Sequence, residues 1–294
     1  MRAALITELG RAPQVGEVPD PSGATIEVLA APLNPVDRAV AAGQFYGGHP
    51  PLPYVPGCEC VGREPTGRVV WTFGGGLGLA RNGTMAERAE PGTVVAEVPD
   101  DADPALAAAL GIAGLAGWMP IVSRAPVRPD DRVLVLGATG VAGQVALQAA
   151  RLLGAESVVA AGRDREGLDR ARALGADEAV HLDDDLGEPT YVFDPLCGEP
   201  LERAVAAAAA GARIVQLGQS AGPAATLPSA AIRGKQLEIL GYSNFTTPPE
   251  LLAEQYRRLV GHALAGAIRL EVDRVGLDDV ASVWDRRGKV VVCP

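Results

Sequence analysis

The sequence has few aromatic and few sulfur-containing side chains. Aromatic residues make up 4% of its 294 residues, so a hydrophobic core has to be built mainly from Ala, Val and Leu, within an apolar content of 48%. Four cysteines are too few and too scattered for a disulfide framework: Cys58, Cys60, Cys197 and Cys293. The length suits two domains of ordinary size.

Cationic residues are also in the minority, because 26 Lys and Arg face 36 Asp and Glu, for a net charge of −10. An acidic chain repels phosphate backbones, which argues against nucleic acid as a partner. No basic run suggests an anionic membrane surface, and no window contains the roughly 18 uninterrupted apolar residues of a membrane span. The N-terminus does not resemble a signal peptide. We therefore expect a soluble, cytoplasmic protein.

The chain changes character along its length. Residues 1 to about 105 are rich in Pro and Gly, with short strand-like runs such as 24–29 and 94–98, which predicts a compact, mostly β domain. Residues 104–122 form an Ala- and Leu-rich helical stretch whose three glycines permit close packing. From residue 131 onward, continuous apolar strands alternate with helices, which predicts a parallel sheet covered on both faces. The tail ends in an apolar strand at 290–292 that we expect to return to the first domain.

A glycine turn follows the first apolar strand, 133–136. The segment Gly137-Ala138-Thr139-Gly140-Val141-Ala142-Gly143 leads into a helix with apolar residues spaced by four. Strand, glycine turn and helix are the context of a dinucleotide fingerprint, in which a diphosphate binds the helix N-terminus. Ala138 occupies the position of the fingerprint's first glycine, and a tight turn without a ligand is the alternative. The predicted contacts are Ala138, Thr139, Gly140, Val141, Ala142 and Gly143.

The end of the second apolar strand points to the kind of cofactor. An acidic residue there usually binds the ribose 2′-hydroxyl of NAD, whereas this chain has Gly162 and Arg163, followed by Asp164 and Arg165. Gly162 leaves room, and the arginines can form charge-assisted hydrogen bonds with a 2′-phosphate. This favours NADPH. Asp164 could instead serve a ribose in an NAD protein, and the arginines could simply be solvated surface charges.

Further cofactor contacts follow from the geometry of such sheets, because ligands bind beyond the carboxyl ends of the strands. This rule points to residues in the loops after three later strands: Pro195, Leu196, Gly218, Gln219, Tyr242, Ser243 and Asn244. Arg286, Arg287 and Lys289 in the tail could reach the adenine phosphates.

Five segments form a pattern that occurs in this order along the chain: Asn34-Pro35-Val36-Asp37, Leu52-Pro53-Tyr54-Val55-Pro56-Gly57, Gly83-Thr84-Met85-Ala86-Glu87, residues 133–143 and Gly288-Lys289-Val290-Val291-Val292. Together they resemble the medium-chain dehydrogenase/reductase superfamily, in its quinone oxidoreductase (zeta-crystallin-like) branch. The resemblance implies an α/β fold with a GroES-like, mostly β catalytic domain (residues 1–108 and 264–294) and a Rossmann domain with a doubly wound parallel sheet (109–263). It also implies a homodimer, often paired through the edges of the Rossmann sheets.

The residues at the positions of the superfamily's zinc ligands do not suit a metal. Asn34 stands at the first position, Cys58 retains a possible ligand at the second, and residues 111–116 offer none at the third. The region of the structural zinc lobe, about 72–92, contains no cysteine. Val36 occupies the place of the hydroxyl that relays a proton in zinc-dependent members. We therefore expect no metal, and Cys58 and Cys60 as small core residues.

Without a Lewis acid to polarise a plain ketone, a conjugated carbonyl is the easier hydride acceptor. The resemblance therefore implies NADPH-dependent reduction of a quinone or an enone. The catalytic candidates are Asn34, which matches the family's active-site Asn and can donate to a developing enolate oxygen, Tyr46 and Tyr54. The family's two active-site tyrosines are replaced by Ala39 and Phe45. Two alternatives remain: a dedicated enone or imine reductase of specialised metabolism, and a low-turnover NADPH-binding protein with a redox-sensing or structural role.

Overall fold

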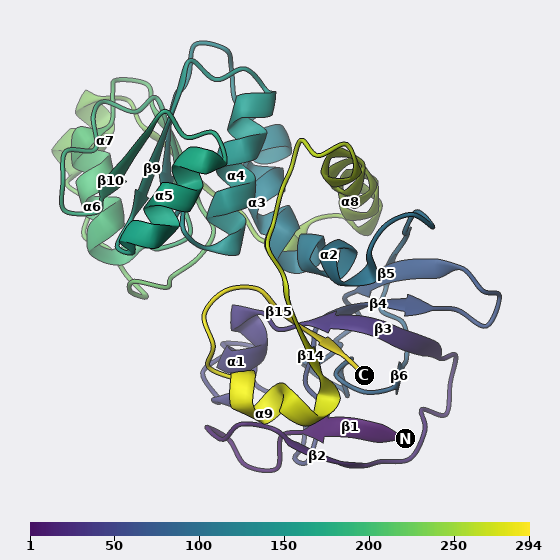
Figure 1. Cartoon of the computed structure of the whole chain (residues 1–294). Helices are drawn as coiled ribbons and strands as arrows, with labels where there is room; N and C mark the ends of the chain where they lie inside the picture. Colours follow the sequence, from purple (N-terminus) through teal and green to yellow (C-terminus); the bar gives the residue numbers. More distant parts are fainter. The chain divides into compact units, whose positions relative to one another are not determined.

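The computed structural model describes all 294 residues, and the chain divides into two compact units. Unit 1 comprises Met1–Ala113, Phe245–Leu264 and Glu271–Pro294, and unit 2 comprises Gly114–Asn244 and Ala265–Leu270. Figure 1 shows the purple N-terminal strands and the yellow C-terminal strand β15 within the same unit. Unit 1 is therefore built from both ends of the sequence.

Unit 1 contains a seven-stranded sheet in the order β14-β15-β3-β4-β5-β7, with β6 paired to β3, and a separate hairpin of β1 and β2. Its strands are β1 (Arg2–Leu5), β2 (Gln14–Glu17), β3 (Ile26–Pro32), β4 (Glu59–Arg63), β5 (Val69–Phe73), β6 (Arg88–Ala89), β7 (Val94–Glu97), β14 (Asp273–Gly276) and β15 (Val290–Cys293). Its helices are α1 (Pro35–Ala41), α2 (Pro104–Ala109), α8 (Pro249–Leu264) and α9 (Val280–Val283), with a short 3-10 helix at Leu277–Asp279.

The C-terminal strand β15 belongs to the centre of this unit. It pairs antiparallel with β3, placing Val292 opposite Ala31, and parallel with β14. Val290 and Val292 are buried in one apolar cluster with Tyr54, Met85 and Trp284. Burial of these valines away from water accounts for the predicted return of the tail to the first domain.

Unit 2 is a six-stranded parallel sheet in the order β10-β9-β8-β11-β12-β13. Its strands are β8 (Arg132–Leu136), β9 (Ser157–Gly162), β10 (Glu178–His181), β11 (Tyr191–Asp194), β12 (Arg213–Gln216) and β13 (Glu238–Gly241). Its helices are α3 (Leu115–Met119), α4 (Val141–Leu152), α5 (Arg165–Ala173), α6 (Gly198–Ala207) and α7 (Ser229–Gly234). A 3-10 helix, Asn244–Thr246, follows β13.

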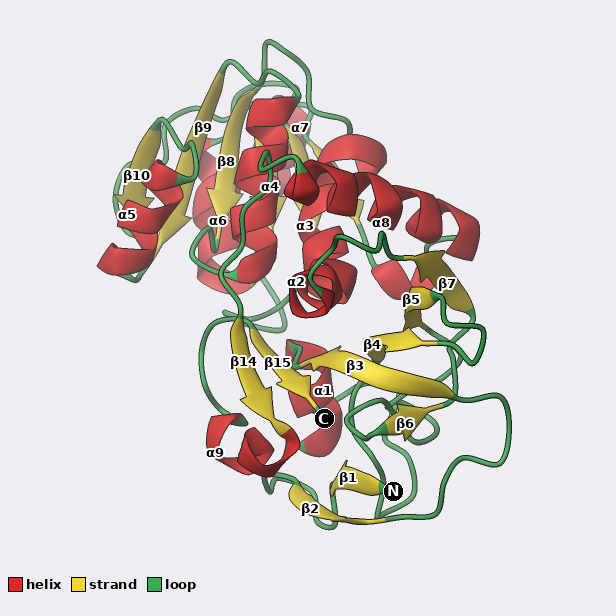
Figure 2. Ribbon diagram, turned by 45° about the vertical axis from the view of Figure 1, so that its right-hand side comes forward, coloured by secondary structure: helices red, strands yellow, loops and turns green.

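Both faces of this sheet are covered, as the continuous apolar strands predict. Leu134 and Leu136 of β8 pack with Leu201 and Val205 of α6, whereas the alternate residues of the strand are buried on the opposite face. Figure 2 shows the yellow strands of this unit flanked by red helices. The strand order reverses between β8 and β11, and such a reversal opens a crevice at the carboxyl ends of the two strands. The predicted fold class is confirmed.

Helix α8 lies in unit 1 rather than in the Rossmann domain, to which the predicted boundaries 109–263 assign it. Its buried face includes Leu252, Tyr256 and Leu259, and the helix packs on β7. The Tyr256 ring stacks on that of Trp71, with the ring centroids 4.4 Å apart. A long amphipathic helix packs on whichever apolar surface is available, and its periodicity does not reveal which one.

The Ala-rich stretch is a kinked succession of helical turns over residues 104–124, and two of its glycines permit close contacts. A Cβ on Gly111 would lie 1.8 Å from Glu59 Oε2, and one on Gly117 would lie 2.3 Å from the carbonyl oxygen of Ala142. By length and composition alone, Pro104–Arg124 could cross a membrane, but 72% of its most apolar window is buried inside the protein, which is typical of a core helix.

Candidate functional site

The glycine turn has the geometry of an anion-binding helix terminus. Gly140 is the N-cap of α4 with extended backbone (φ −82°, ψ 164°), and no side chain caps the helix. The first N–H groups of a helix have no intrahelical acceptor, and they carry the positive end of the helix dipole. The N–H groups of Val141, Ala142 and Gly143 therefore form a cradle for an anion.

The glycines of this turn have different structural roles. A Cβ on Gly143 would lie 2.4 Å from the carbonyl oxygen of Gly137, so this glycine lets α4 pack against the turn. A Cβ on Gly140 would approach no atom more closely than 3.4 Å, so the protein itself does not require glycine there. Ala138 is fully buried and its N–H donates to Ala161 of β9 at 3.1 Å, so the substituted first glycine does not obstruct the turn.

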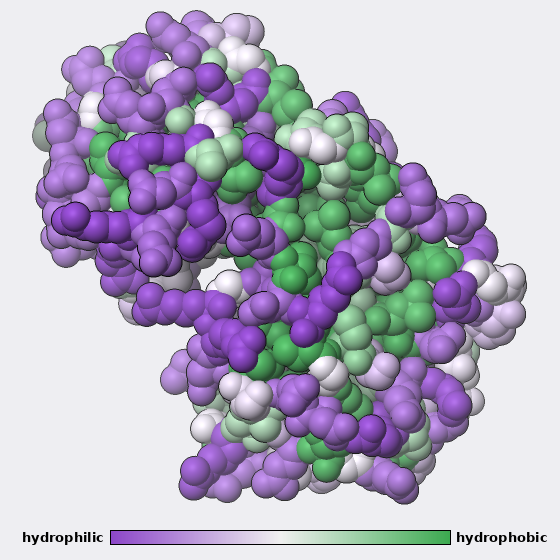
Figure 3. All heavy atoms as spheres, in the orientation of Figure 1, coloured by the Kyte–Doolittle hydropathy of each residue, from purple (hydrophilic) through white to green (hydrophobic).

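At the end of β9, the acidic residue has partners within the chain and the two basic residues have none. Asp164 is the N-cap of α5, where its carboxylate accepts the N–H of Gly167 at 3.0 Å and pairs with Arg170 at 3.6 Å. Arg163 and Arg165 are exposed, and neither side chain has a hydrogen bond or an ion pair within the chain. Figure 3 shows that hydrophilic residues cover most of the visible surface of unit 2. The arginines are thus available to an anion, whereas Asp164 uses its Oδ2 atom for the cap and for Arg170.

The space next to Gly162 is not empty, contrary to the sequence interpretation that this glycine leaves room for a ligand. A Cβ on Gly162 would lie 2.9 Å from Cγ2 of Thr139, so the Thr139 methyl group fills that space. Gly162 itself is buried.

The loops after β11 and β12 lie beside the glycine turn. A Cβ on Gly137 would contact Leu196 at 3.0 Å and Pro195 at 3.2 Å, and one on Gly218 would lie 2.5 Å from the Pro195 carbonyl oxygen. Four of the predicted segments therefore meet at the carboxyl edge of the sheet: the glycine turn, the end of β9, residues 195–196 and residue 218. Gln219 is exposed next to Gly218.

The predicted residues 242–244 follow β13, the edge strand of the sheet. The Tyr242 hydroxyl donates to Asn244 Oδ1 at 2.5 Å, and Asn244 is buried. They are separated from the glycine turn by strands β11 and β12.

Asp194 shapes the loop after β11, which is one of the loops that the strand-end rule indicates. Its side chain is fully buried, and Oδ1 accepts the N–H groups of Leu196 and Cys197, both at 2.9 Å. Its Oδ2 atom has no hydrogen-bond partner, and burial raises the pKa of the carboxyl group. The position of this residue at the carboxyl end of a strand is what the sequence rule uses, whereas its role in holding the loop is visible only in the structure.

In unit 1, Asn34 lies in a buried polar cluster. Its Nδ2 donates to Glu59 Oε1 at 2.9 Å and makes a longer contact of 3.4 Å with the Pro32 carbonyl oxygen, while its Oδ1 accepts from Lys289 Nζ at 2.7 Å. The other carboxylate oxygen of Glu59 accepts from the Trp71 indole and from the Ile112 N–H, both at 2.7 Å. Asn34 therefore bridges a buried carboxylate and a buried ammonium group, with a relative exposure of 1%.

The charges of this cluster are strongly affected by burial. Desolvation raises the pKa of Glu59 to about 7, although Lys289 and three hydrogen bonds oppose the shift. Desolvation lowers the pKa of Lys289 to about 8, against the attraction of Glu59 and Asp37. Because Lys289 is buried and bonded to Asn34, the sequence interpretation that it reaches adenine phosphates as a tail cation is wrong.

The two tyrosine candidates occupy opposite environments. Tyr54 is 2% exposed, its hydroxyl has no partner, and burial raises its pKa. Tyr46 is 88% exposed, and its ring centroid lies 4.4 Å from that of Phe45. The Phe45 ring neighbours that of Phe245, which neighbours Phe73, which in turn stacks on Trp71. This row of aromatic rings connects the exposed Tyr46 with Glu59, to which the Trp71 indole donates a hydrogen bond.

No group of three His, Cys, Asp or Glu side chains lies close enough together to hold a metal ion. Cys58 and Cys60 are both buried, and the N–H of Cys58 donates to Asp37 at 3.0 Å.

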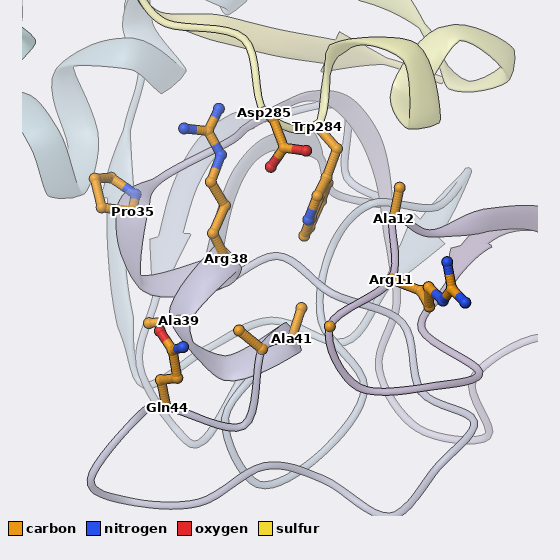
Figure 4. A pocket seen from close by; sticks show the side chains of 11 residues that line it. Arg11, Ala12, Pro35, Arg38, Ala39, Ala41, Gln44, Trp284 and Asp285 are labelled. Atoms are coloured by element: carbon orange, nitrogen blue, oxygen red, sulfur yellow. The ribbon is translucent and has the colours of Figure 1, made fainter.

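A pocket of about 330 Å³ lies elsewhere in unit 1, and none of the predicted site residues line it. Figure 4 shows Arg38, Trp284 and Asp285 around it, with the small side chains Ala39 and Ala41 on α1. The Arg38 guanidinium donates to the Arg286 carbonyl oxygen at 2.7 Å.

The sequence is similar to that of known dehydrogenases and reductases. A family model described as zinc-binding dehydrogenase matches residues 141–260. One of the subunits of the phenolphthiocerol/phthiocerol polyketide synthase of Mycobacterium tuberculosis is 29% identical over 92% of this chain, which spans only 14% of that protein's length. Quinone oxidoreductase-like protein 2 of Rattus norvegicus is 28% identical, with 82% of this chain and 74% of the relative aligned.

Solved structures match the complete fold, and two of them serve as examples. A crystal structure of an NAD-dependent alcohol dehydrogenase has a TM-score of 0.88 and 27% identity, with both chains fully covered. The YhdH oxidoreductase of Salmonella enterica, crystallised in complex with NADP, has a TM-score of 0.86 and 22% identity, again over all of both chains.

Proposed function

The chain belongs to the medium-chain dehydrogenase/reductase superfamily, and we propose that it is an NADPH-dependent reductase of conjugated carbonyl compounds that works without a metal. The observation that carries this proposal is the open N-terminus of α4 behind Gly140, where the chain leaves room for a ligand against bare main chain.

The preference for NADPH over NADH is supported by the end of β9. Asp164 is committed to capping α5, whereas Arg163 and Arg165 are unpaired. A 2′-phosphate can therefore find guanidinium partners here, whereas a ribose 2′-hydroxyl has only the Oδ1 atom of the capping Asp164 as an acidic partner. The NADP complex of YhdH supports the same choice.

The name of the matching family model implies zinc, but the residues of this chain do not fit a zinc site. Asn34 is a poor ligand, Cys58 is buried beside Asp37, and no third ligand is close to them. We therefore derive no step through a metal ion.

The proposed acceptor follows from this chemistry. Bound NADPH supplies a hydride from its nicotinamide ring. A conjugated acceptor spreads the developing negative charge over several atoms, so it needs less electrophilic assistance than a simple ketone. The quinone oxidoreductase-like relative supports a quinone or enone substrate.

We assign Asn34 to the developing enolate oxygen. One of its amide hydrogens is bonded to Glu59 at 2.9 Å, and the other makes only the long 3.4 Å contact with Pro32, so the second hydrogen is the weakly held one that we assign to the substrate oxygen. Lys289 at Oδ1 withdraws electron density from the amide and so strengthens its N–H groups as donors. Tyr54 retains its proton, because burial raises its pKa. Tyr46 offers an exposed ring to an apolar substrate.

We also propose a homodimer formed through unit 2. β13 is an edge strand, Ile239 on it is 38% exposed, and α7, the helix before it in sequence, buries none of its residues. An unpaired edge with an exposed apolar side chain suits pairing with a second copy. Light scattering of the wild type and of Ile239→Lys tests this proposal: a dimer and a monomer are expected, and a monomeric wild type contradicts it.

Calorimetric titration with NADPH and NADH, followed by absorbance assays with simple quinones and enones, tests the function. We expect much tighter binding of NADPH and its consumption above background. Absence of binding of either nucleotide at millimolar concentration contradicts the oxidoreductase assignment, and binding without turnover across a broad panel contradicts the catalytic one.

A further inference from the structure

The Thr139 side chain connects two parts of the cofactor site that are distant in sequence. Its methyl group lies in a notch formed by Gly162 at the end of β9 and Gly167 in the first turn of α5. A Cβ on Gly162 would lie 2.9 Å from Thr139 Cγ2, and one on Gly167 would lie 2.6 Å from the same atom. Only residues without side chains can form this notch at such distances.

The backbone of Thr139 is part of the glycine turn. Its carbonyl oxygen accepts from the Gln144 side chain of α4 at 3.0 Å, which holds the residue to the helix that begins at Val141. Its hydroxyl makes no hydrogen bond within the chain and is not a buried unpaired atom, so it reaches solvent. Thr139 is thus fixed to α4 through its backbone and to the β9–α5 loop through its methyl group.

That loop carries the two unpaired arginines. Asp164 caps α5 through the N–H of Gly167, so a hydrogen bond ties the notch residue Gly167 to the arginine-bearing segment 163–165. A guanidinium–phosphate pair is short and directional, so its strength depends on where this segment lies relative to the diphosphate cradle. The only side chain of the glycine turn shown to contact both Gly162 and Gly167 is that of Thr139.

We propose that Thr139 is a positioning residue that sets the distance between the diphosphate cradle and the arginine loop, and that its methyl group thereby determines selectivity for a 2′-phosphorylated dinucleotide. This inference rests on the proposed function. It assigns the two halves of the side chain different tasks: the methyl group positions the loop, and the hydroxyl is dispensable for selectivity.

Three substitutions at this position separate the two halves. Thr139→Val keeps both the notch-filling methyl group and the shape, and loses the hydroxyl. Thr139→Ser keeps the hydroxyl and loses the methyl group, and Thr139→Ala loses both. The readout is the ratio of the dissociation constants for NADH and NADPH, measured by calorimetry on the full-length protein.

We expect the ratio of the valine variant to stay within about twofold of the wild type. The serine and alanine variants should lose about fourfold or more in the ratio, the effect of one buried methyl group, with most of the loss in NADPH affinity. A loss of hydroxyl contact with the diphosphate would weaken both nucleotides equally and leave the ratio unchanged.

A size swap tests the notch directly. Gly162→Ala alone places a methyl group against Thr139 and should lower the ratio. In the double variant Gly162→Ala/Thr139→Ser the methyl group moves to the Gly162 side of the contact, where the next neighbour of the new Cβ is Leu168 at 3.3 Å, while the contact with Gly167 stays lost. The double variant should therefore recover part of the ratio that Gly162→Ala loses, a non-additive result that contacting residues give.

The outcomes distinguish this inference from the proposed function. If the wild type binds neither nucleotide, the proposed function fails. If the wild type prefers NADPH but the serine variant keeps the same ratio, or the valine variant loses it, the role of the methyl group is wrong. Melting temperatures identify a merely structural role, because that role lowers stability without changing the ratio.

Discussion

Replacement of Gly140 by alanine separates the needs of the protein from those of its proposed ligand. The backbone there is extended (φ −82°, ψ 164°), which alanine adopts freely, and the new Cβ would have the Gly137 carbonyl oxygen as its nearest neighbour at 3.4 Å. Alanine is a poorer N-cap than glycine, which destabilises the folded state. Alanine also lowers the conformational entropy of the unfolded chain, which stabilises the folded state by about 0.4–1 kcal/mol and offsets the weaker cap. The free energy of unfolding should change by less than about 1 kcal/mol.

Binding should respond quite differently. A methyl group at the mouth of the α4 cradle keeps the diphosphate from main-chain N–H groups, and hydrogen bonds to charged groups contribute about 1.5–3 kcal/mol each. Loss of two such bonds corresponds to about 3–6 kcal/mol, or a rise in the dissociation constant of roughly 10²- to 10⁴-fold. NADPH and NADH should be affected alike, because both carry the diphosphate.

The assay is calorimetric titration of wild type and Gly140→Ala, with melting temperatures measured on the same samples. Gly261→Ala in α8 is the matched control, since no atom lies within 4 Å of its added Cβ. If Gly140→Ala binds NADPH within threefold of the wild type, the diphosphate does not rest on this turn and the reasoning is refuted.

Other substitutions examine the remaining parts of the site. Gly143→Ala brings a Cβ to 2.4 Å from the Gly137 carbonyl oxygen, so its unfolding free energy should fall by about 1–3 kcal/mol; an unchanged melting temperature would count against that packing. Arg163→Ala should weaken NADPH binding at least about tenfold and spare NADH, in calorimetry with both nucleotides; an equal loss for both would contradict its contact with the 2′-phosphate. Burial raises the pKa of Glu59 from 4.5 to about 7, so the folded state holds a proton that the unfolded state has lost, and the contribution of this group to stability decreases as pH rises between those values. Melting curves from pH 4.5 to 7 should show a smaller decline for Glu59→Gln than for the wild type, and identical slopes would rule out the shift. Metal analysis of the purified protein should find well under one zinc per chain; one tightly held zinc would overturn the metal-free proposal.

The sequence was informative where function depends on neighbours in the chain. The apolar strand 133–136, the glycines after it and the helix from Val141 form one local unit, so their arrangement could be predicted from spacing alone. The same holds for Arg163, which directly follows a strand end. The different roles of Asp164 and the arginines depend on the helix cap that Asp164 forms, which is also a local interaction. Only the structure shows that Asp164 accepts the N–H of Gly167.

Long-range contacts were beyond such reasoning. Asn34 meets Glu59 across 25 residues and Lys289 across 255, and no periodicity indicates such a meeting. The assignment of α8 to unit 1 depended in the same way on tertiary packing, through Tyr256 against Trp71. The notch for Thr139 required atomic distances, since Gly162 and Gly167 alone suggest flexibility or room.

The position of β15 between β14 and β3 has a consequence for how the two units form during synthesis. Every strand of the parallel sheet has left the ribosome once residue 241 has emerged, so that unit can begin folding while translation continues. The unit holding Asn34 must wait for Val290–Cys293, and until then β3 has an open edge and Asn34 lacks its ammonium partner. In nascent chains stalled before residue 289, we therefore expect proteases to cleave the N-terminal third of the chain, which contains Asn34, more readily than in the complete protein.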